Sequence, residues 1–286
     1  MDNLRRRPGR PQGRVPGSPP RQRCRPPAST YDAGMEYRTS GTFPSAAVDW
    51  LAPARAGRVL AVGRASAATA ARISGPDVPT TITDRSPSAV RAAHHRFPQL
   101  QPVAASPDAL PFTPCSFEQV LVAQGMHLLA PGLALAEFAR VLAPGGRLAV
   151  LFTVRDDSVP WVRRLAAILR RYDPEVMTKG EELYSVAAIA ASPHFPVVEH
   201  RAFRLWVPIT REGMLEMVSS APQLATLGQP DADELIGEVG ALYDSSARAP
   251  EPLLLPYSVM CWRAVVDHTE LTAALHPPED GLQIRL

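Results

Sequence analysis

A strand-to-helix transition at 59–73 constrains the fold of this chain more than any other feature. The apolar run at 59–62 predicts a short parallel strand, because strands covered on both faces are continuously apolar. The alanine-rich run from Ser66 predicts a helix, so Gly63-Arg64-Ala65 must turn the chain sharply between the two. In open α/β sheets, the first such turn lies where nucleoside-containing ligands bind. We therefore expect this turn to contribute to a cofactor site.

The same stretch resembles motif I of the Rossmann-like, S-adenosylmethionine-dependent methyltransferases. That motif has an acidic residue followed by three alternating glycines; here Gly63 is the first glycine, and Ala61, Ala65 and Ala67 occupy the other positions. An alanine held at positive φ costs about 1 kcal/mol, and its methyl group can crowd a ligand. The alternative for this stretch is an ordinary strand followed by a core helix.

A carboxylate is predicted at the end of the second strand. The β-branched run at 80–83 predicts that strand, and Asp84 closes it. A carboxylate at this position can accept hydrogen bonds from both ribose hydroxyls of a bound nucleoside, so we assign Asp84 and the adjacent Arg85 to the cofactor site. The alternative is that Asp84 only caps the next helix, which Ser86 would begin.

The third strand, expected at 100–105, is followed by a loop that resembles the adenine-binding segment of the family. There, a carboxylate and a backbone N–H hold the adenine, whereas this chain has Ser106 and Pro107. Serine is a weaker acceptor than a carboxylate, and proline has no N–H. Asp108 would take the role of the carboxylate if the loop shifted. The resemblance thus implies that Ser106, Pro107 and Asp108 approach the adenine.

The fourth strand, expected within 116–127, resembles that of the family and ends on polar residues. Gln124 and His127 should emerge at its carboxyl end, beside the cofactor. His127 is the candidate catalytic residue, since an imidazole there can orient or deprotonate a methyl acceptor. The alternative is that His127 caps the strand or packs beneath the cofactor.

The strongest resemblance is the segment at 137–147, where Gly145-Gly146 should end a helix at 133–142 and lead into a strand at 148–153. A hairpin or strand pair at 195–206 and a last strand at 253–264 should complete the sheet. These C-terminal segments resemble the UbiE-like bacterial subgroup, which implies that Pro160-Trp161 and the helix after Thr210 wall the acceptor pocket.

The motifs occur in the family's order, which predicts an α/β, Rossmann-like fold. We expect a seven-stranded, mostly parallel sheet with helices on both faces and an antiparallel last strand. The expected organisation is a disordered basic tail at 1–34, a methyltransferase domain at 35–267 with acceptor-pocket helices within 155–250, and a loose tail at 268–286.

Composition limits the partners. Residues 1–30 hold eight arginines and one acid, so the rest of the chain is net acidic and nucleic-acid binding is not expected.

Three widely spaced cysteines indicate neither a disulfide framework nor a zinc site, and no metal is expected. The absence of a long apolar run argues against a membrane span or a secretory signal, which favours a cytoplasmic protein. The oligomeric state is not specified by the sequence.

These residues are compatible with three functions. The first is methyl transfer from S-adenosylmethionine to a small, fairly apolar acceptor. The second is a methyltransferase-fold protein that has lost tight cofactor binding and acts by binding a partner or another ligand; the departures from the motifs favour it. The third, a nicotinamide-dependent oxidoreductase, is disfavoured by the motifs after the fourth strand.

Overall fold

The computed structural model describes residues 43–172, 186–221, 227–247 and 252–272. The predicted basic tail at 1–34, the first residues of the predicted domain and the C-terminal 273–286 lie outside these ranges.

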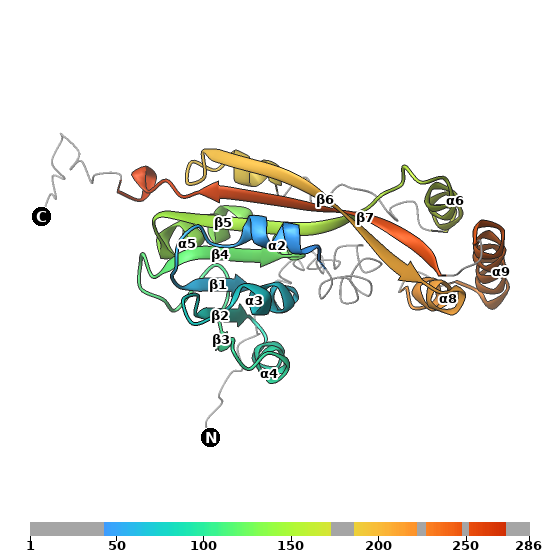
Figure 1. Cartoon of the computed structure of the whole chain (residues 1–286), viewed down its shortest axis with the longest axis horizontal. Coiled ribbons are helices and arrows are strands. Elements are labelled where there is room, and N and C mark those ends of the chain that lie inside the picture. Colours follow the sequence, from blue (N-terminus) through green and yellow to red (C-terminus); the bar gives the residue numbers. More distant parts are fainter. Residues whose placement is uncertain (1–42, 173–185, 222–226, 248–251, 273–286) are drawn as a thin grey trace, which may run out of the picture.

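One seven-stranded sheet organises the molecule (Figure 1), with the strand order β3-β2-β1-β4-β5-β7-β6. The strands are β1 (Val59–Val62), β2 (Thr80–Asp84), β3 (Gln101–Ala104), β4 (Phe117–Ala123), β5 (Leu142–Arg155), β6 (Val197–Ile209) and β7 (Leu253–Val265). Neighbouring strands from β3 to β5 pair in parallel, and β7 is antiparallel to both β5 and β6. All four residues of β1 are buried, as expected for a strand covered on both faces. The predicted fold class is confirmed.

Helices cover both faces of the sheet. They are α2 (Ser45–Leu51), α3 (Ala67–Ile73), α4 (Pro87–Arg96), α5 (Pro131–Val141), α6 (Pro160–Leu169), α8 (Arg211–Ser219) and α9 (Gln229–Ser246). Buried residues of α2, α3, α4, α6, α8 and α9 belong to one hydrophobic cluster, and those of α5 to a second cluster on the opposite face.

The Gly145-Gly146 turn has the structural role expected of it. Gly145 has φ +77°, a conformation that favours glycine. A Cβ on Gly146 would stand 2.7 Å from the carbonyl oxygen of Ala143 and 3.2 Å from that of Glu118. The helix boundaries differ slightly from the prediction, because α5 ends at Val141 and β5 already pairs with β4 at Leu142.

One expectation for the C-terminal half was wrong. The segment expected as a hairpin at 195–206 is one thirteen-residue strand, β6, which pairs with β7 along its whole length. This ribbon extends past the parallel strands and carries α6, α8 and α9 at its far end (Figure 1). Just after the predicted domain boundary at 267, His268 Nε2 contacts the Ala139 carbonyl oxygen at 3.0 Å and Thr269–Thr272 form a 3-10 helix.

The described residues include free thiols but neither a group of metal ligands nor a membrane-spanning helix. Cys115 and Cys261 are free, and burial raises the pKa of the Cys261 thiol to about 12. Within the same ranges, no three potential ligand side chains lie close enough to hold a metal ion. None of the described helices is both long and apolar enough to cross a membrane.

Candidate cofactor site

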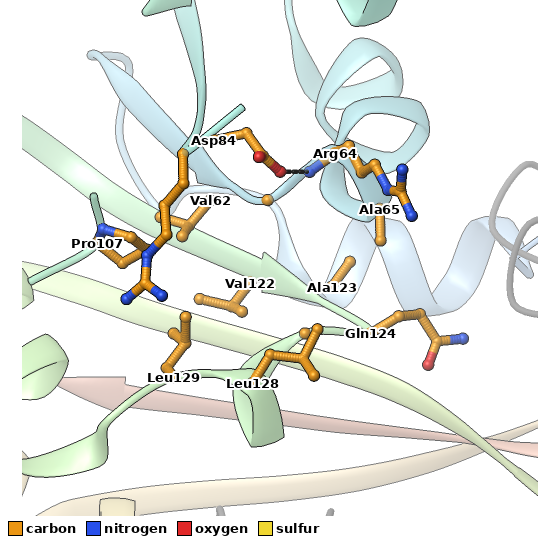
Figure 2. A pocket seen from close by; sticks show the side chains of 13 residues that line it. Val62, Arg64, Ala65, Asp84, Pro107, Val122, Ala123, Gln124, Leu128 and Leu129 are labelled. Carbon is orange, nitrogen blue, oxygen red and sulfur yellow. Dashed lines mark hydrogen bonds between the residues drawn. The ribbon is translucent and has the colours of Figure 1, made fainter. Parts of the chain in front are cut away.

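A cavity of about 280 Å³ opens where β1, β2 and β4 end (Figure 2). Seven of the residues predicted to bind the cofactor line it: Gly63, Arg64, Ala65, Asp84, Arg85, Pro107 and Gln124. The rest of the described lining is mostly apolar and includes Val62, Val122, Leu128 and Leu129. Seven of the predicted site residues therefore converge on one cavity, although they are separated by up to 61 positions in the sequence.

The turn after β1 is less strained than its alanines suggest. Gly63 has φ +79°, and its N–H donates to the Thr83 carbonyl oxygen at 2.7 Å, which holds the turn against β2. Among the described non-glycine residues, only Cys115 and Gln124 have positive φ. Ala65 and Ala67 therefore carry none of the backbone cost that was considered for them, and Ala67 lies in the right-handed helical region at φ −58°.

Ser66, which the sequence analysis did not assign to the site, connects the two strands beneath the cavity. Its side chain is fully buried; the hydroxyl donates to the Val62 carbonyl oxygen at 2.6 Å and accepts from the Ala123 N–H at 2.8 Å. Val62 and Ala123 are the last residues of β1 and β4, and both line the cavity. A serine just after a glycine turn was the only sequence signal for this role.

Asp84 organises the backbone on the β2 side of the cavity. Its carboxylate accepts from the Arg64 N–H at 3.0 Å (Figure 2) and from the Ser86 N–H at 2.8 Å. Ser86 is the N-cap of α4, and its own hydroxyl accepts from the Ala89 N–H. An ionised carboxylate has about four acceptor positions, so two remain for a ligand. Asp84 is therefore not the helix cap that the alternative proposed, and its contact with the cap residue Ser86 leaves room for a ribose.

The expected adenine side is held together by Arg85. Its Nε donates to the Ser106 hydroxyl at 3.0 Å, and its terminal nitrogen lies 3.6 Å from the Asp108 carboxylate, to which Ser106 also donates. The hydrogen bond from Ser106 is the largest cause of the lowered pKa of the Asp108 carboxyl, and the interactions with Arg85 lower this pKa further. Pro107 lines the cavity, whereas Ser106 and Asp108 do not. This side of the cavity is therefore lined by Pro107 and Arg85, which an adenine ring bound there would contact.

Gln124 and His127 are placed differently from each other. Gln124 is buried with φ +53°; its amide oxygen accepts from the Thr153 N–H at 3.1 Å, and its amide nitrogen donates to the Thr153 hydroxyl at 2.7 Å. These bonds fix the ends of β4 and β5 side by side. His127 lies half-buried in the 3-10 helix Met126–Leu128 and is not among the residues that line the cavity.

The helices expected to wall an acceptor pocket contribute nothing to this cavity among the described residues. Val162 and Leu165 of α6, Met214 of α8 and Tyr243 of α9 are buried in the same hydrophobic cluster as Leu205 of β6 and Leu255 of β7. Their assignment to the acceptor stays a prediction.

Comparisons with known proteins agree with this arrangement. A model of the methyltransferase domain matches residues 60–150, which contain most of the cavity lining. An uncharacterized methyltransferase of Mycobacterium tuberculosis is 28% identical over 240 residues, covering 82% of this chain and 93% of that protein. The ubiquinone/menaquinone biosynthesis C-methyltransferase of Syntrophotalea carbinolica is 35% identical over 153 residues, covering 50% of this chain and 62% of that protein.

A solved structure described as a candidate type II methyltransferase from Anaeromyxobacter dehalogenans shares the fold. The TM-score is 0.54 at 19% sequence identity, and the match covers 78% of this chain and 95% of that one. The motif order, the strand order and the cavity at the carboxyl ends of β1, β2 and β4 agree with these matches. Residues 60–150 thus match the methyltransferase domain, and the chain is similar in sequence to proteins named methyltransferases and in fold to a solved one.

Proposed function

We propose that this chain transfers a methyl group from S-adenosylmethionine to a small, largely apolar acceptor. The observation that carries the proposal is the cavity at the ends of β1, β2 and β4, where Gly63 at positive φ and the Asp84 carboxylate face the same space. Its volume of about 280 Å³ lies near the lower end of small-molecule sites. No atom lies within 4 Å of the position of a Cβ on Gly63, so the turn leaves room for a ligand.

The residues of the cavity fit the two ends of the cofactor unequally. Asp84 offers its remaining acceptor positions to the ribose hydroxyls, and the turn from Gly63 to Ala67 lies beneath the methionine part. Pro107 and the Arg85 side chain supply contact area on the adenine side, but Pro107 has no N–H to donate. S-adenosylmethionine brings an already activated methyl group, so the chain's main tasks are to align the acceptor and exclude water.

The acceptor is proposed to lie beside the apolar rim of the cavity. Leu128 lines the cavity and is still 60% exposed, and Leu129 is half-buried next to it. Apolar lining of this kind favours an acceptor with an apolar body. The relative named for ubiquinone/menaquinone biosynthesis supports a small-molecule acceptor. His127 is close in sequence to this rim, and its role in orienting the acceptor remains part of the proposal.

A second candidate function is that of a methyltransferase-fold protein with weak or lost cofactor binding, which acts by binding a partner or another ligand. The specific observation in its favour is the adenine side. Pro107 lacks a donor there, and the Ser106 hydroxyl is already engaged with Arg85 and Asp108.

Calorimetric titration of the full chain with S-adenosylmethionine and S-adenosylhomocysteine separates the two functions. Dissociation constants in the micromolar range would support the enzyme. In the enzyme, Asp84→Ala should bind the cofactor more weakly. Asp49 is an exposed acid on α2 outside the cavity, so Asp49→Ala is the matched control and should bind the cofactor like the unmodified protein. The absence of both heat and a thermal shift at millimolar ligand would refute the enzyme and leave the binding protein.

A further inference from the structure

Arg155, the last residue of β5, is the most unusual charged residue in the structure. It is only 8% exposed, and its Nε and both terminal nitrogens are buried without a hydrogen-bond partner within the part of the chain that the structure describes. Other arginines of the fold have carboxylate partners: Arg140 pairs with Glu137, and Arg263 pairs with Glu199. Burial therefore does not by itself explain the isolation of Arg155.

An isolated buried guanidinium is unfavourable. Arginine keeps its charge throughout the physiological range, and burying a charge without a partner costs far more than burying a paired one. The guanidinium also presents five donors in a rigid fork that matches a carboxylate or a phosphate. A buried arginine with all of its donors unused is thus prepared to receive an oxyanion, and the binding of that oxyanion would offset the cost of its burial.

The position of Arg155 relates this group to the cavity. Gln124 lines the cavity and is hydrogen-bonded to Thr153, and Arg155 follows Thr153 by two residues on the same face of β5. Two residues of a strand span roughly 6–7 Å. Arg155 is thus displaced from the cavity toward the carboxyl end of β5, on the side away from Asp84, since β2 and β5 lie on opposite sides of β1 and β4.

We propose that Arg155 binds an oxyanion carried by the methyl acceptor, so that the acceptor is a small organic acid or phosphate ester with an apolar body. This inference rests on the proposed methyl transfer for the identity of the ligand. Donor and acceptor must lie side by side for transfer, and a charge-assisted contact at the end of β5 fixes one end of the acceptor while the apolar rim contacts its body.

Two other anions would also fit the chemistry of Arg155, and the experiment has to separate them from the acceptor. One is the methionine carboxylate of the cofactor. The other is a carboxylate of this chain from 173–185, a range outside the described residues whose sequence contains Asp173, Glu175, Glu181 and Glu182. Each of the three anions predicts a different response to removal of the guanidinium.

The test compares the full chain with Arg155→Met and with the control Arg204→Met. Arg204 is exposed on β6, so its replacement removes the same charge without touching the buried position. Thermal unfolding is measured with increasing sodium acetate or sodium phosphate, with sodium chloride at matched ionic strength as reference. We expect the anions to raise the Tm of the unmodified protein and of Arg204→Met, and to leave that of Arg155→Met unchanged. Acetate and phosphate serve separately as probes for a carboxylate and for a phosphate.

The remaining outcomes overturn the proposal in distinguishable ways. Without added anion, Arg155→Met should be at least as stable as the unmodified protein; a large loss of stability would assign Arg155 to a carboxylate of the chain itself. A more than tenfold loss of S-adenosylhomocysteine affinity in Arg155→Met would assign it to the cofactor. An anion response that persists in a protein unable to bind S-adenosylhomocysteine would refute the methyl transfer but leave the anion site. No response to either anion in the unmodified protein would refute the site itself.

Discussion

Ser66→Ala is the sharpest test of how the site is built, because one buried hydroxyl joins the ends of two strands. In the native protein it donates to Val62 of β1 and accepts from Ala123 of β4. Two buried hydrogen bonds contribute about 1 kcal/mol each, and the stranded Ala123 N–H adds a desolvation cost of about 1–3 kcal/mol. We therefore expect the substitution to lower the free energy of unfolding by about 3–5 kcal/mol.

Urea denaturation measures this loss from the shift of the unfolding midpoint, provided that the slope m is unchanged. Ser219→Ala is the matched control, because the Ser219 hydroxyl is exposed and donates to the carbonyl oxygen of Glu216 within its own helix. The control should change stability by less than about 0.5 kcal/mol. A loss at Ser66 as small as that of the control would refute the argument that this hydroxyl joins β1 to β4.

Three further predictions concern the cofactor and the frame around it. Asp84→Ala should weaken S-adenosylmethionine binding by about 1.5–3 kcal/mol in calorimetry, through the loss of charge-assisted bonds to the ribose; unchanged affinity would remove Asp84 from the site. Gly146→Ala should lower the free energy of unfolding in urea by about 1–3 kcal/mol, since its Cβ would stand 2.7 Å from the Ala143 carbonyl oxygen. Hydrogen bonds from Arg140 hold the pKa of Glu137 below its ordinary value of 4.5, so this pair stabilises the fold fully above pH 4.5 and loses its contribution as the pH falls through the lower folded value. Glu137→Gln should therefore reduce the drop in Tm between pH 6 and pH 3, and an identical pH profile would contradict this.

The sequence predicted local features well where one residue determines the geometry. Thr210 caps its helix through a side-chain hydrogen bond, as its residue type and position indicated, whereas the N-cap of α4 is Ser86 and not Asp84. Gly63 and Gly145 have the positive φ that glycine allows at sharp turns. Asp84 ends β2 at the cavity as expected. In each case, the information lies within a few residues of the position it determines.

The prediction was less complete where the geometry depends on backbone details. Alanine in place of a motif glycine suggested strain, yet the chain enters a 3-10 helix at Arg64 and keeps Ala67 in an ordinary helical conformation. Replacing these alanines with glycine would relieve no backbone strain. Similarly, the 3-10 helix after β4 places Leu128 and Leu129 at the cavity rather than His127.

The segment at 137–147 also makes a physical connection that its resemblance to the family did not reveal. Glu137 accepts from the Leu110 N–H at 2.7 Å, and Arg140 donates both to Glu137 and to the carbonyl oxygens of Leu110 and Phe112. The 110–112 loop is thus tied to α5 by one ion pair. These residues support the frame of the fold rather than the chemistry, so they carry no information on the reaction.

Arg155 marks the limit of what the sequence alone predicts. A strand expected to end at residue 153 would have left Arg155 in a loop, where an arginine is solvated and needs no partner. In the structure, β5 continues to Arg155 because β7, about one hundred residues later in the chain, pairs with it through Tyr257. That pairing carries the guanidinium into a buried position beyond the cavity. An arginine that would be solvated in a loop is thus buried because of the register between β5 and a strand far away in the sequence. Local sequence patterns cannot predict that register, so they could not predict the buried guanidinium.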